Sequence, residues 1–273
     1  MNAAGSSATF ELLPPVELRL PERPALGVRM IRPRSQPRAA MLHIHGGGFA
    51  FGDAAMEDEN NSALAGALGI ATISVGYRLA PAHPHPAALE DCEAAALWLI
   101  ASGAPQLGTA NLLIGGESVG AGLSVLTLMR LRDRHSAAQR FRGASLVAGG
   151  YDFSKTPSQR ASTGALFLSP ARLDATVAAA FPGRDAEALR DPGISALYAD
   201  LRGLPPAIFS VGSSDAVLDD SLFMTARWRA AGNRTQLEVY EQATHLFVRE
   251  PTPVAAEARR RIAVFLESCY ASV

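Results

Sequence analysis

One serine lies in a pattern that is typical of an activated nucleophile. Ser118 is the central residue of Gly116-Glu117-Ser118-Val119-Gly120, which matches G-x-S-x-G. The apolar run LLIG precedes this pattern, and AGLSVLTLMRL follows it with helical spacing. We therefore predict that Ser118 occupies a tight strand-to-helix turn that holds its hydroxyl out of the sheet. A glycine-rich turn in which Ser118 only caps the helix is the alternative, because short Gly- and Ser-rich patterns recur by chance.

A second segment offers backbone hydrogen-bond donors. His45-Gly46-Gly47-Gly48-Phe49 directly follows the apolar run AMLHI. Three successive glycines are entropically costly, so we expect a requirement for bare backbone here. A loop whose N–H groups face a developing negative oxygen meets that requirement. A phosphate-binding turn is the alternative, but the Lys-Ser/Thr pair of a P-loop does not follow.

An acid and a base complete the set of candidate reactive residues. Asp215 follows the apolar run PAIFSV, and His245 follows QLEVY, so each comes just after a predicted strand. Ser118, Asp215 and His245 occur in the chain order of an α/β-hydrolase triad. Capping of the next helix is the alternative role for Asp215, as it is for Asp219 and Asp220.

Metal binding is a weaker interpretation of the remaining polar residues. His43 and His45 lie two residues apart, hence on one face of a strand, but the sequence offers no third ligand nearby. Cys92 and Cys269 are isolated, with no CxxC pair and no disulfide framework. We therefore expect neither a metal nor an organic cofactor.

Short apolar runs alternate with helical patterns along the chain, and this predicts a mainly parallel sheet covered on both faces. Reactive groups gather beyond the carboxyl ends of the strands in such sheets. The expected strands cover 16–32 in part, then 40–45, 70–76, 111–115, 144–149, 206–211 and 236–240. The expected helices cover 57–68, 86–101, 119–132, 171–181, 218–231 and 253–268.

Taken together, these motifs resemble the hormone-sensitive-lipase-like family of α/β-hydrolases, the bacterial carboxylesterases of family IV. The resemblance extends from about residue 40 to the C-terminus. It rests on HGGGF at 45–49, YRLAP at 77–81 with PAALED at 86–91, GESVG at 116–120, GLPPAIFSVG at 203–212, DAVLDD at 215–220 and THLF at 244–247.

The resemblance implies a serine carboxylesterase acting on short- to medium-chain acyl esters. Ser118 would be the nucleophile, His245 the base and Asp215 the residue that orients His245. The oxyanion hole would consist of the N–H groups of Gly47, Gly48 and Val119, with Gly46 shaping the turn beside His45. A homodimer formed through the last strand and helix is also implied. Amide or formamide hydrolases, small-molecule deacetylases and non-catalytic ligand-binding homologues remain alternatives.

The chain departs from the family pattern in three respects. Ala82 and His85 stand where Glu and Phe are more usual. Glu117 and Val119 stand where Asp and Ala are usual beside the serine. Only 44 residues precede His45, fewer than the family's cap helices usually occupy. We therefore expect a reduced cap made of residues 1–15 and an insertion at about 152–200, over an acyl channel lined by Phe153, Leu166, Phe167, Leu168 and Phe181.

Length and charge set the remaining limits. A chain of 273 residues fits a single domain over 1–273. The 25 basic and 26 acidic side chains balance, which argues against nucleic-acid binding. No basic and then apolar leader opens the chain, and no run approaches the about 18 apolar residues of a membrane helix. We expect a soluble, cytoplasmic protein without membrane contact, acting on a small-molecule ester.

Overall fold

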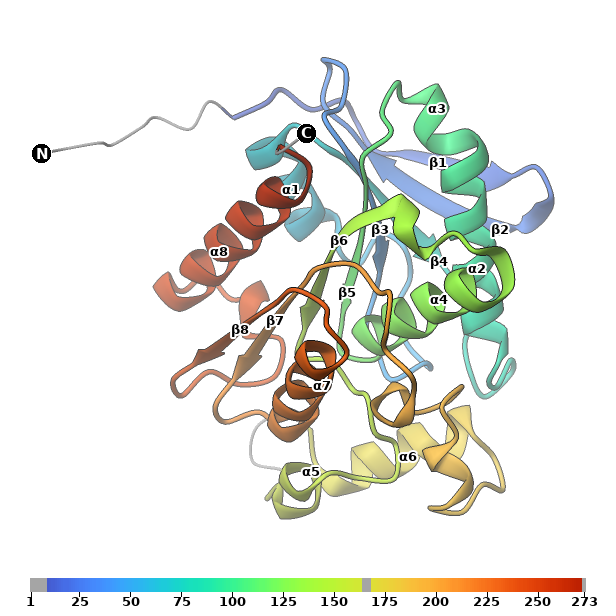
Figure 1. Ribbon diagram of the computed structural model, residues 1–273, viewed down its shortest axis with the longest axis vertical. Helices are drawn as coiled ribbons and strands as arrows, with labels where there is room; N and C mark the ends of the chain where they lie inside the picture. Colours follow the sequence, from blue (N-terminus) through green and yellow to red (C-terminus); the bar gives the residue numbers. More distant parts are fainter. Residues whose placement is uncertain (1–8, 164–167, 272–273) are drawn as a thin grey trace, which may run out of the picture.

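The computed structural model describes residues 9–163 and 168–271, which form one eight-stranded sheet flanked by helices (Figure 1). The strand order is β1-β2-β4-β3-β5-β6-β7-β8. The strands are β1 (Val16–Leu20), β2 (Arg23–Ile31), β3 (Ala40–Ile44), β4 (Ala71–Gly76), β5 (Leu112–Glu117), β6 (Phe141–Val147), β7 (Ala207–Gly212) and β8 (Thr235–Tyr240). β2 pairs antiparallel with β1 and β4, and every other neighbouring pair is parallel. The predicted α/β class with a mainly parallel sheet is therefore confirmed.

Two layers of helices cover the sheet. α1 (Asp58–Leu68) and α8 (Pro253–Tyr270) lie side by side on one face (Figure 1). α2 (Ala87–Trp98), α4 (Val119–His135) and α7 (Leu218–Ala230) cover the other face. Such coverage is needed because parallel strands expose apolar side chains on both faces.

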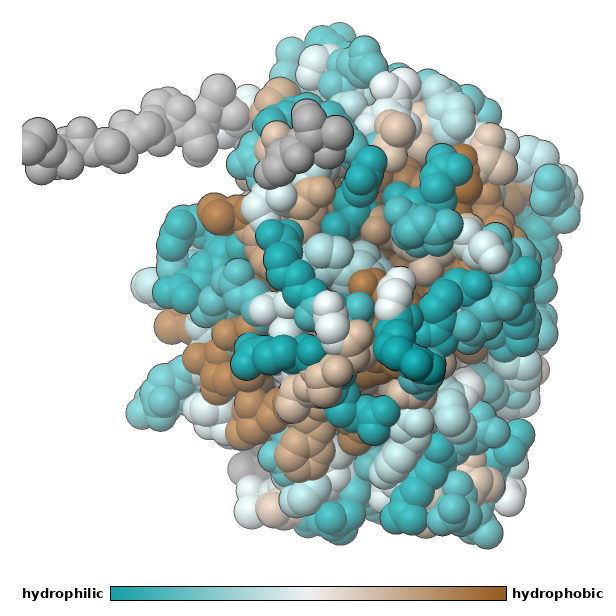
Figure 2. Space-filling model, viewed as in Figure 1, coloured by the Kyte–Doolittle hydropathy of each residue, from teal (hydrophilic) through white to brown (hydrophobic). Residues whose placement is uncertain are grey.

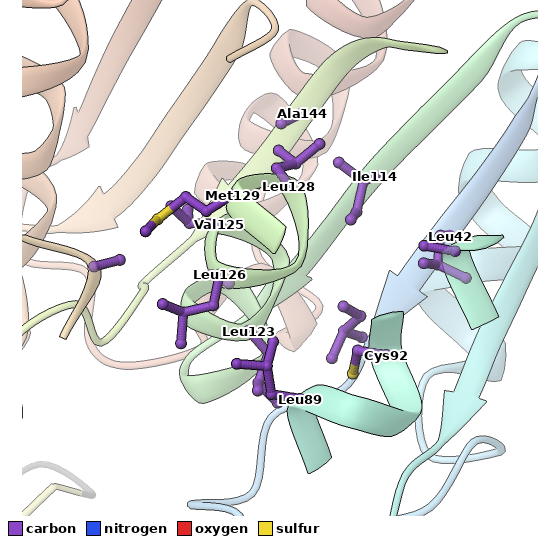
Figure 3. Packing of buried hydrophobic residues seen from close by; sticks show 14 of the residues in the cluster. Leu42, Leu89, Cys92, Ile114, Leu123, Val125, Leu126, Leu128, Met129 and Ala144 are labelled. Carbon is purple, nitrogen blue, oxygen red and sulfur yellow. The ribbon is translucent and has the colours of Figure 1, made fainter. Parts of the chain in front are cut away.

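Side chains of the central strands point alternately to the two faces of the sheet, so the hydrophobic core consists of two clusters, one on each face. Leu42 of β3 and Ile114 of β5 belong to the cluster under α2 and α4, which Figure 3 shows together with Leu123 and Leu128 of α4 and Leu89 of α2. Their neighbours Met41 and Leu113 belong to the cluster under α1 and α8. Successive strand residues point to opposite faces, so one short strand supports both cores. Each fully buried aliphatic side chain stabilises the fold by roughly 2 kcal/mol.

The expected elements are present, and their boundaries differ where local chemistry is unusual. β5 extends two residues beyond the prediction, because Gly116 and Glu117 still pair with β6. β6 begins earlier than predicted, at Phe141. The helix expected over 86–101 loses its α-helical bonding after Trp98 and continues as a wider turn, Leu99–Gly103.

The described residues of the segment at 152–200 form α5 (Pro157–Ala161), α6 (Pro170–Ala180) and two short 3₁₀ turns. Leu166 and Phe167, which were expected in the acyl channel, lie outside the described residues. Lys155, the one lysine in the sequence, pairs with Asp174 of α6 at 2.5 Å. This ion pair joins two parts of the 152–200 segment to each other.

Asp220 of α7 anchors the beginning of this segment. Its fully buried carboxylate accepts hydrogen bonds from the backbone N–H groups of Tyr151 and Asp152, at 2.8 and 2.9 Å. Thr156 and Gln159 donate two more, each at 2.8 Å. Burial raises the pKa of Asp220 to about 7, and these four donors oppose the rise. Two donors reach each oxygen of Asp220, and hydrogen bonds of this kind favour the charged form of the carboxyl group.

The surface has a mixed character. In Figure 2, hydrophilic residues cover most of the visible face, and hydrophobic residues gather near β8 and α7. Val239 of β8 and Phe223 of α7 are exposed there. None of the helices in the described part of the chain combines the length and apolar character that crossing a bilayer requires.

Replacing Asp220 tests its anchoring role. Asp220→Ala should lower the free energy of unfolding by about 3 kcal/mol or more, because it leaves several buried donors without acceptors. Urea unfolding measures the change. Asp200→Ala is the matched control, since Asp200 pairs with Arg202 at the surface, where solvent screens the pair, and should contribute much less. Equal losses in the two variants would contradict the anchoring role.

Candidate active site

Ser118 lies in a strained turn between β5 and α4. Its backbone φ is 56° and ψ is −124°, a conformation that costs energy for any residue with a side chain. A Cβ atom at Gly120 would clash with the carbonyl oxygen of Ile44. The predicted strand-to-helix turn is therefore present, and its close packing against β3 explains the glycine after Val119.

Ser118, Asp215 and His245 meet although they lie far apart in the chain. The distance from Ser118 Oγ to His245 Nε2 is 3.0 Å. His245 Nδ1 lies 3.0 and 3.1 Å from the two carboxylate oxygens of Asp215. Because Nδ1–H donates to the carboxylate, Nε2 is left to accept the Ser118 proton. His245 and Asp215 are only 6% and 4% exposed, so water competes little for these bonds.

The neighbouring acids have other partners. Asp215 accepts a bond from Val217 N–H at 3.1 Å within its own loop, and α7 begins three residues later. Asp219 accepts a bond from Ser158 N–H at 2.7 Å. Asp219 and Asp220 thus hold the 152–200 segment, whereas Asp215 contacts His245.

The loop at 45–49 lies beside Ser118. Gly47 has φ of 105°, and a Cβ there would clash with the carbonyl oxygen of Phe51. No described residue accepts a hydrogen bond from the N–H of Gly47 or Gly48. Val119 begins α4, where the N–H has no partner within the helix. These three donors all border the same cavity as Ser118.

His45 supports this loop. Its ring stacks on Tyr77 with a 4.1 Å centroid separation, and Nδ1 lies 2.7 Å from the Gly46 carbonyl oxygen. The Tyr77 hydroxyl lies within 3.1 Å of the carbonyl oxygens of His45 and Gly46. Burial lowers the pKa of His45 to about 4, so the ring is uncharged at neutral pH. His45 therefore shapes the loop as an uncharged hydrogen-bonding ring.

A cavity of about 480 Å³ opens at Ser118. Leu173, Thr176 and Val177 of α6 form much of its wall, together with Phe153 and Leu168. The prediction that Phe181 lines the acyl channel is wrong. Its ring is buried against Phe49 and Phe153, and Phe181 is not among the residues that line the cavity. The cavity is largely apolar, and its polar groups are concentrated around the serine.

A buried ion network links three segments of the site. Arg249 Nε donates to Glu117 Oε2 at 2.7 Å, and the same guanidinium pairs with Glu57. Glu117 precedes Ser118, and Arg249 follows His245 by four residues. The sequence motifs did not single out Arg249 and Glu57, because a sequence separation of 192 positions hides the pairing. Glu117, next to Ser118 in the serine motif, is the one member of this network that the sequence motifs include.

Glu57 and Glu117 also approach His43. Burial raises the pKa of Glu117 to about 7, Glu57 adds to the rise, and Arg249 opposes it. Atoms of His43, Glu57 and Glu117 that could bind a metal ion lie within 4.8 Å of one another. The sequence did not indicate that Glu57 and Glu117 would be neighbours of His43. His45 lies outside this group. The Arg249 guanidinium already binds both carboxylates, and a metal ion would have to compete with it.

Comparison with known proteins identifies the family. The family model for the α/β-hydrolase fold named Abhydrolase_3 matches residues 41–249. The chain belongs to this family. Among its relatives, an acetyl-hydrolase of Streptomyces hygroscopicus is 31% identical over 236 residues, which cover 86% of this chain and 76% of the relative.

Solved structures of similar hydrolases agree with this family. An esterase of Pyrobaculum calidifontis has a TM-score of 0.86 and 26% identity, covering 96% of this chain and 86% of its own. An esterase of the bacterial hormone-sensitive lipase family has a TM-score of 0.81 and 28% identity, covering 94% and 84%. The resemblance to hormone-sensitive-lipase-like proteins is therefore confirmed for this hydrolase.

Removal of Arg249 tests the ion network. Arg249→Ala should lower the free energy of unfolding by about 3 kcal/mol, because two buried carboxylates lose their shared cation. Urea unfolding at pH 7.5 measures this loss. Arg261→Ala is the control: Arg261 is exposed, pairs with Glu238 and Glu257, and should contribute much less because solvent screens these pairs. A loss no larger for Arg249→Ala than for the control would contradict a buried network.

Proposed function

We propose that this hydrolase is a serine carboxylesterase that cleaves short- to medium-chain acyl esters. The observation that carries the proposal is the continuous hydrogen-bonded series from Ser118 through His245 to Asp215, with 3.0 Å at each step. The family membership and the esterases among its structural neighbours support the same reaction class.

The first step forms an acyl-enzyme. His245 Nε2 takes the proton of Ser118 while Oγ attacks the ester carbonyl carbon. Asp215 holds the ring in the tautomer in which Nε2 carries no proton and can accept one from Ser118. Asp215 also stabilises the charged imidazolium. When the tetrahedral intermediate collapses, the C–O bond to the alcohol breaks and His245 returns its proton to the departing alcohol.

The second step releases the acid. Water, deprotonated by His245, attacks the acyl carbon, and Ser118 leaves with the proton restored. In both steps the carbonyl oxygen gains negative charge next to the N–H groups of Gly47, Gly48 and Val119. One such donor contributes about 10²–10³-fold in rate, because it is oriented before the charge develops.

The walls of the cavity support an apolar acyl group. Leu173 and Val177 of α6 offer aliphatic contacts, and the volume of about 480 Å³ accommodates a chain of moderate length. We assign α6 and the rest of the 152–200 segment to a reduced cap. The expected N-terminal arm does not join this cap in its described residues: Phe10 N–H donates to the Gly66 carbonyl oxygen and its ring lies beside Gly69, at the end of the sheet where β4 begins. A short cap leaves the alcohol side of the ester more accessible to solvent.

Two alternatives share parts of this site. Amide or formamide hydrolysis and deacetylation use the same reactive groups, and one relative is an acetyl-hydrolase. A non-catalytic binding protein would not need the Ser118–His245 contact. Labelling of Ser118 by a fluorophosphonate distinguishes the enzyme from the binding protein.

Substitutions in the triad should have ranked effects. Ser118→Ala should abolish turnover of an aryl butyrate, because the attacking oxygen is lost. Asp215→Asn should reduce kcat about 10³–10⁴-fold, because it disturbs the tautomer of His245. Asp219→Asn is the matched control and should be much milder, since Asp219 contacts Ser158.

Circular dichroism and thermal unfolding verify that each variant is folded. Near-normal turnover by a folded Ser118→Ala variant would refute the nucleophile. A larger loss for Asp219→Asn than for Asp215→Asn would refute the acid.

An acyl-length series addresses the substrate class. We expect kcat/KM for aryl esters to be highest between acetate and octanoate, with an aryl formamide and an acetanilide cleaved more slowly. Side-by-side initial rates at one pH measure the preference. Faster cleavage of the formamide or the anilide than of every ester would replace the esterase assignment with the corresponding alternative.

A further inference from the structure

A second cleft lies behind the catalytic turn, between the sheet and helices α1 and α8, which Figure 1 shows side by side. Its volume is about 370 Å³. It shares no lining residue with the cavity at Ser118, although Glu117 borders the one and Ser118 the other. The proposed esterase mechanism makes no use of this space.

Aliphatic side chains form much of the cleft wall. Met41 and Val147 contribute from the sheet, Leu64 and Leu68 from α1, and Ile262 from α8. An apolar cavity of about 150 Å³ is large enough to bind benzene, so this cleft suits a molecule of about twice that size. Burial of such a body against aliphatic side chains is favourable, because it removes apolar surface from water.

Polar side chains also line the cleft: Asn60, Asn61, Ser145, Arg259, Arg260 and Glu267, and, from the sheet, His43 and Glu117. His43 and Glu117 come from the neighbouring strands β3 and β5 and are 6% and 5% exposed. Nδ1 of His43 is buried without a hydrogen-bond partner. A ligand atom of His43 and one of Glu117 lie within 4.8 Å of each other, a separation that one oxygen at about 2.8 Å from each can bridge.

Hydrogen-bonding capacity selects the ligand group that fits between His43 and Glu117. Burial keeps His43 uncharged, so its ring offers one donor and one acceptor, and Glu117 offers an acceptor. A hydroxyl both donates and accepts, which satisfies the pair. A carboxylate has no proton to donate to Glu117, and an ammonium group has no lone pair to accept from the ring N–H, whereas Arg259, Arg260 and Glu267 place charges of both signs at the cleft. A pure hydrocarbon would leave the imidazole unpaired.

We propose that this cleft is a binding site for an uncharged alcohol or phenol whose apolar body fills the space between α1 and α8 and whose hydroxyl lies between His43 and Glu117. The site is distinct from the catalytic cavity, and its occupation does not require turnover.

Binding of 2-naphthol, naphthalene and 2-naphthoate, measured by isothermal titration calorimetry, tests this proposal. 2-Naphthol should bind at least tenfold more tightly than either analogue. Ala67→Phe, at an exposed position that lines the cleft on α1, should weaken 2-naphthol binding at least tenfold. Ala226→Phe, at an exposed position on α7 away from the cleft, is the matched control and should bind as the unchanged protein does.

A further variant isolates the polar anchor. His43→Leu should reduce the preference for 2-naphthol over naphthalene while naphthalene still binds. If that variant fails to fold, the three ligands compared on the unchanged protein decide the question alone. Equal affinity for 2-naphthol and naphthalene would overturn the hydroxyl site. Equal binding by Ala67→Phe and Ala226→Phe would assign the naphthol to the catalytic cavity and overturn the second site.

Discussion

The close packing of the Ser118 turn against the end of β3 is the constraint on which the rest of the site depends. Side chains at Gly116 or Gly120 would collide with the carbonyl oxygen of Ile44, so the turn exists only with bare backbone there. This contact sets the position of the Ser118 hydroxyl and of the Val119 N–H. It also brings the turn against the start of the glycine loop, since a Cβ at Gly46 would lie 3.0 Å from the Glu117 carbonyl oxygen.

Each reactive group depends on a neighbour that is itself buried. Tyr77 holds the glycine loop through His45, and Arg249 links the segment after His245 to Glu117. Asp220 attaches the 152–200 segment, whose helix α6 forms the cavity wall. These contacts are polar and shielded from water, so each is costly to leave half-made. Other loop conformations would leave these polar groups without partners, so the loops adopt a single conformation.

Glu117 lies where the carboxyl edge of the sheet meets the face covered by α1 and α8. The carboxyl ends of β5, β7 and β8 lead to Ser118, Asp215 and His245, as expected for parallel strands. The α1–α8 face contains the ion network around Glu117 and the cleft next to it. Glu117 is common to this edge and this face, because it is the last residue of the strand that ends at Ser118.

The sequence alone determined the strand-to-helix alternation, the serine turn and the glycine loop. These features are local: apolar period, glycine placement and chain order are all visible within short windows. It also indicated Asp215 over Asp219, since the position after the strand PAIFSV places it at the correct edge. Tertiary structure decided what depends on distant partners: Arg249 with Glu57, Asp220 with the segment from Tyr151, and Phe181 behind the cavity wall. A contact between residues so far apart in the chain is set by how helices and strands pack, and packing leaves no periodic signal in the sequence.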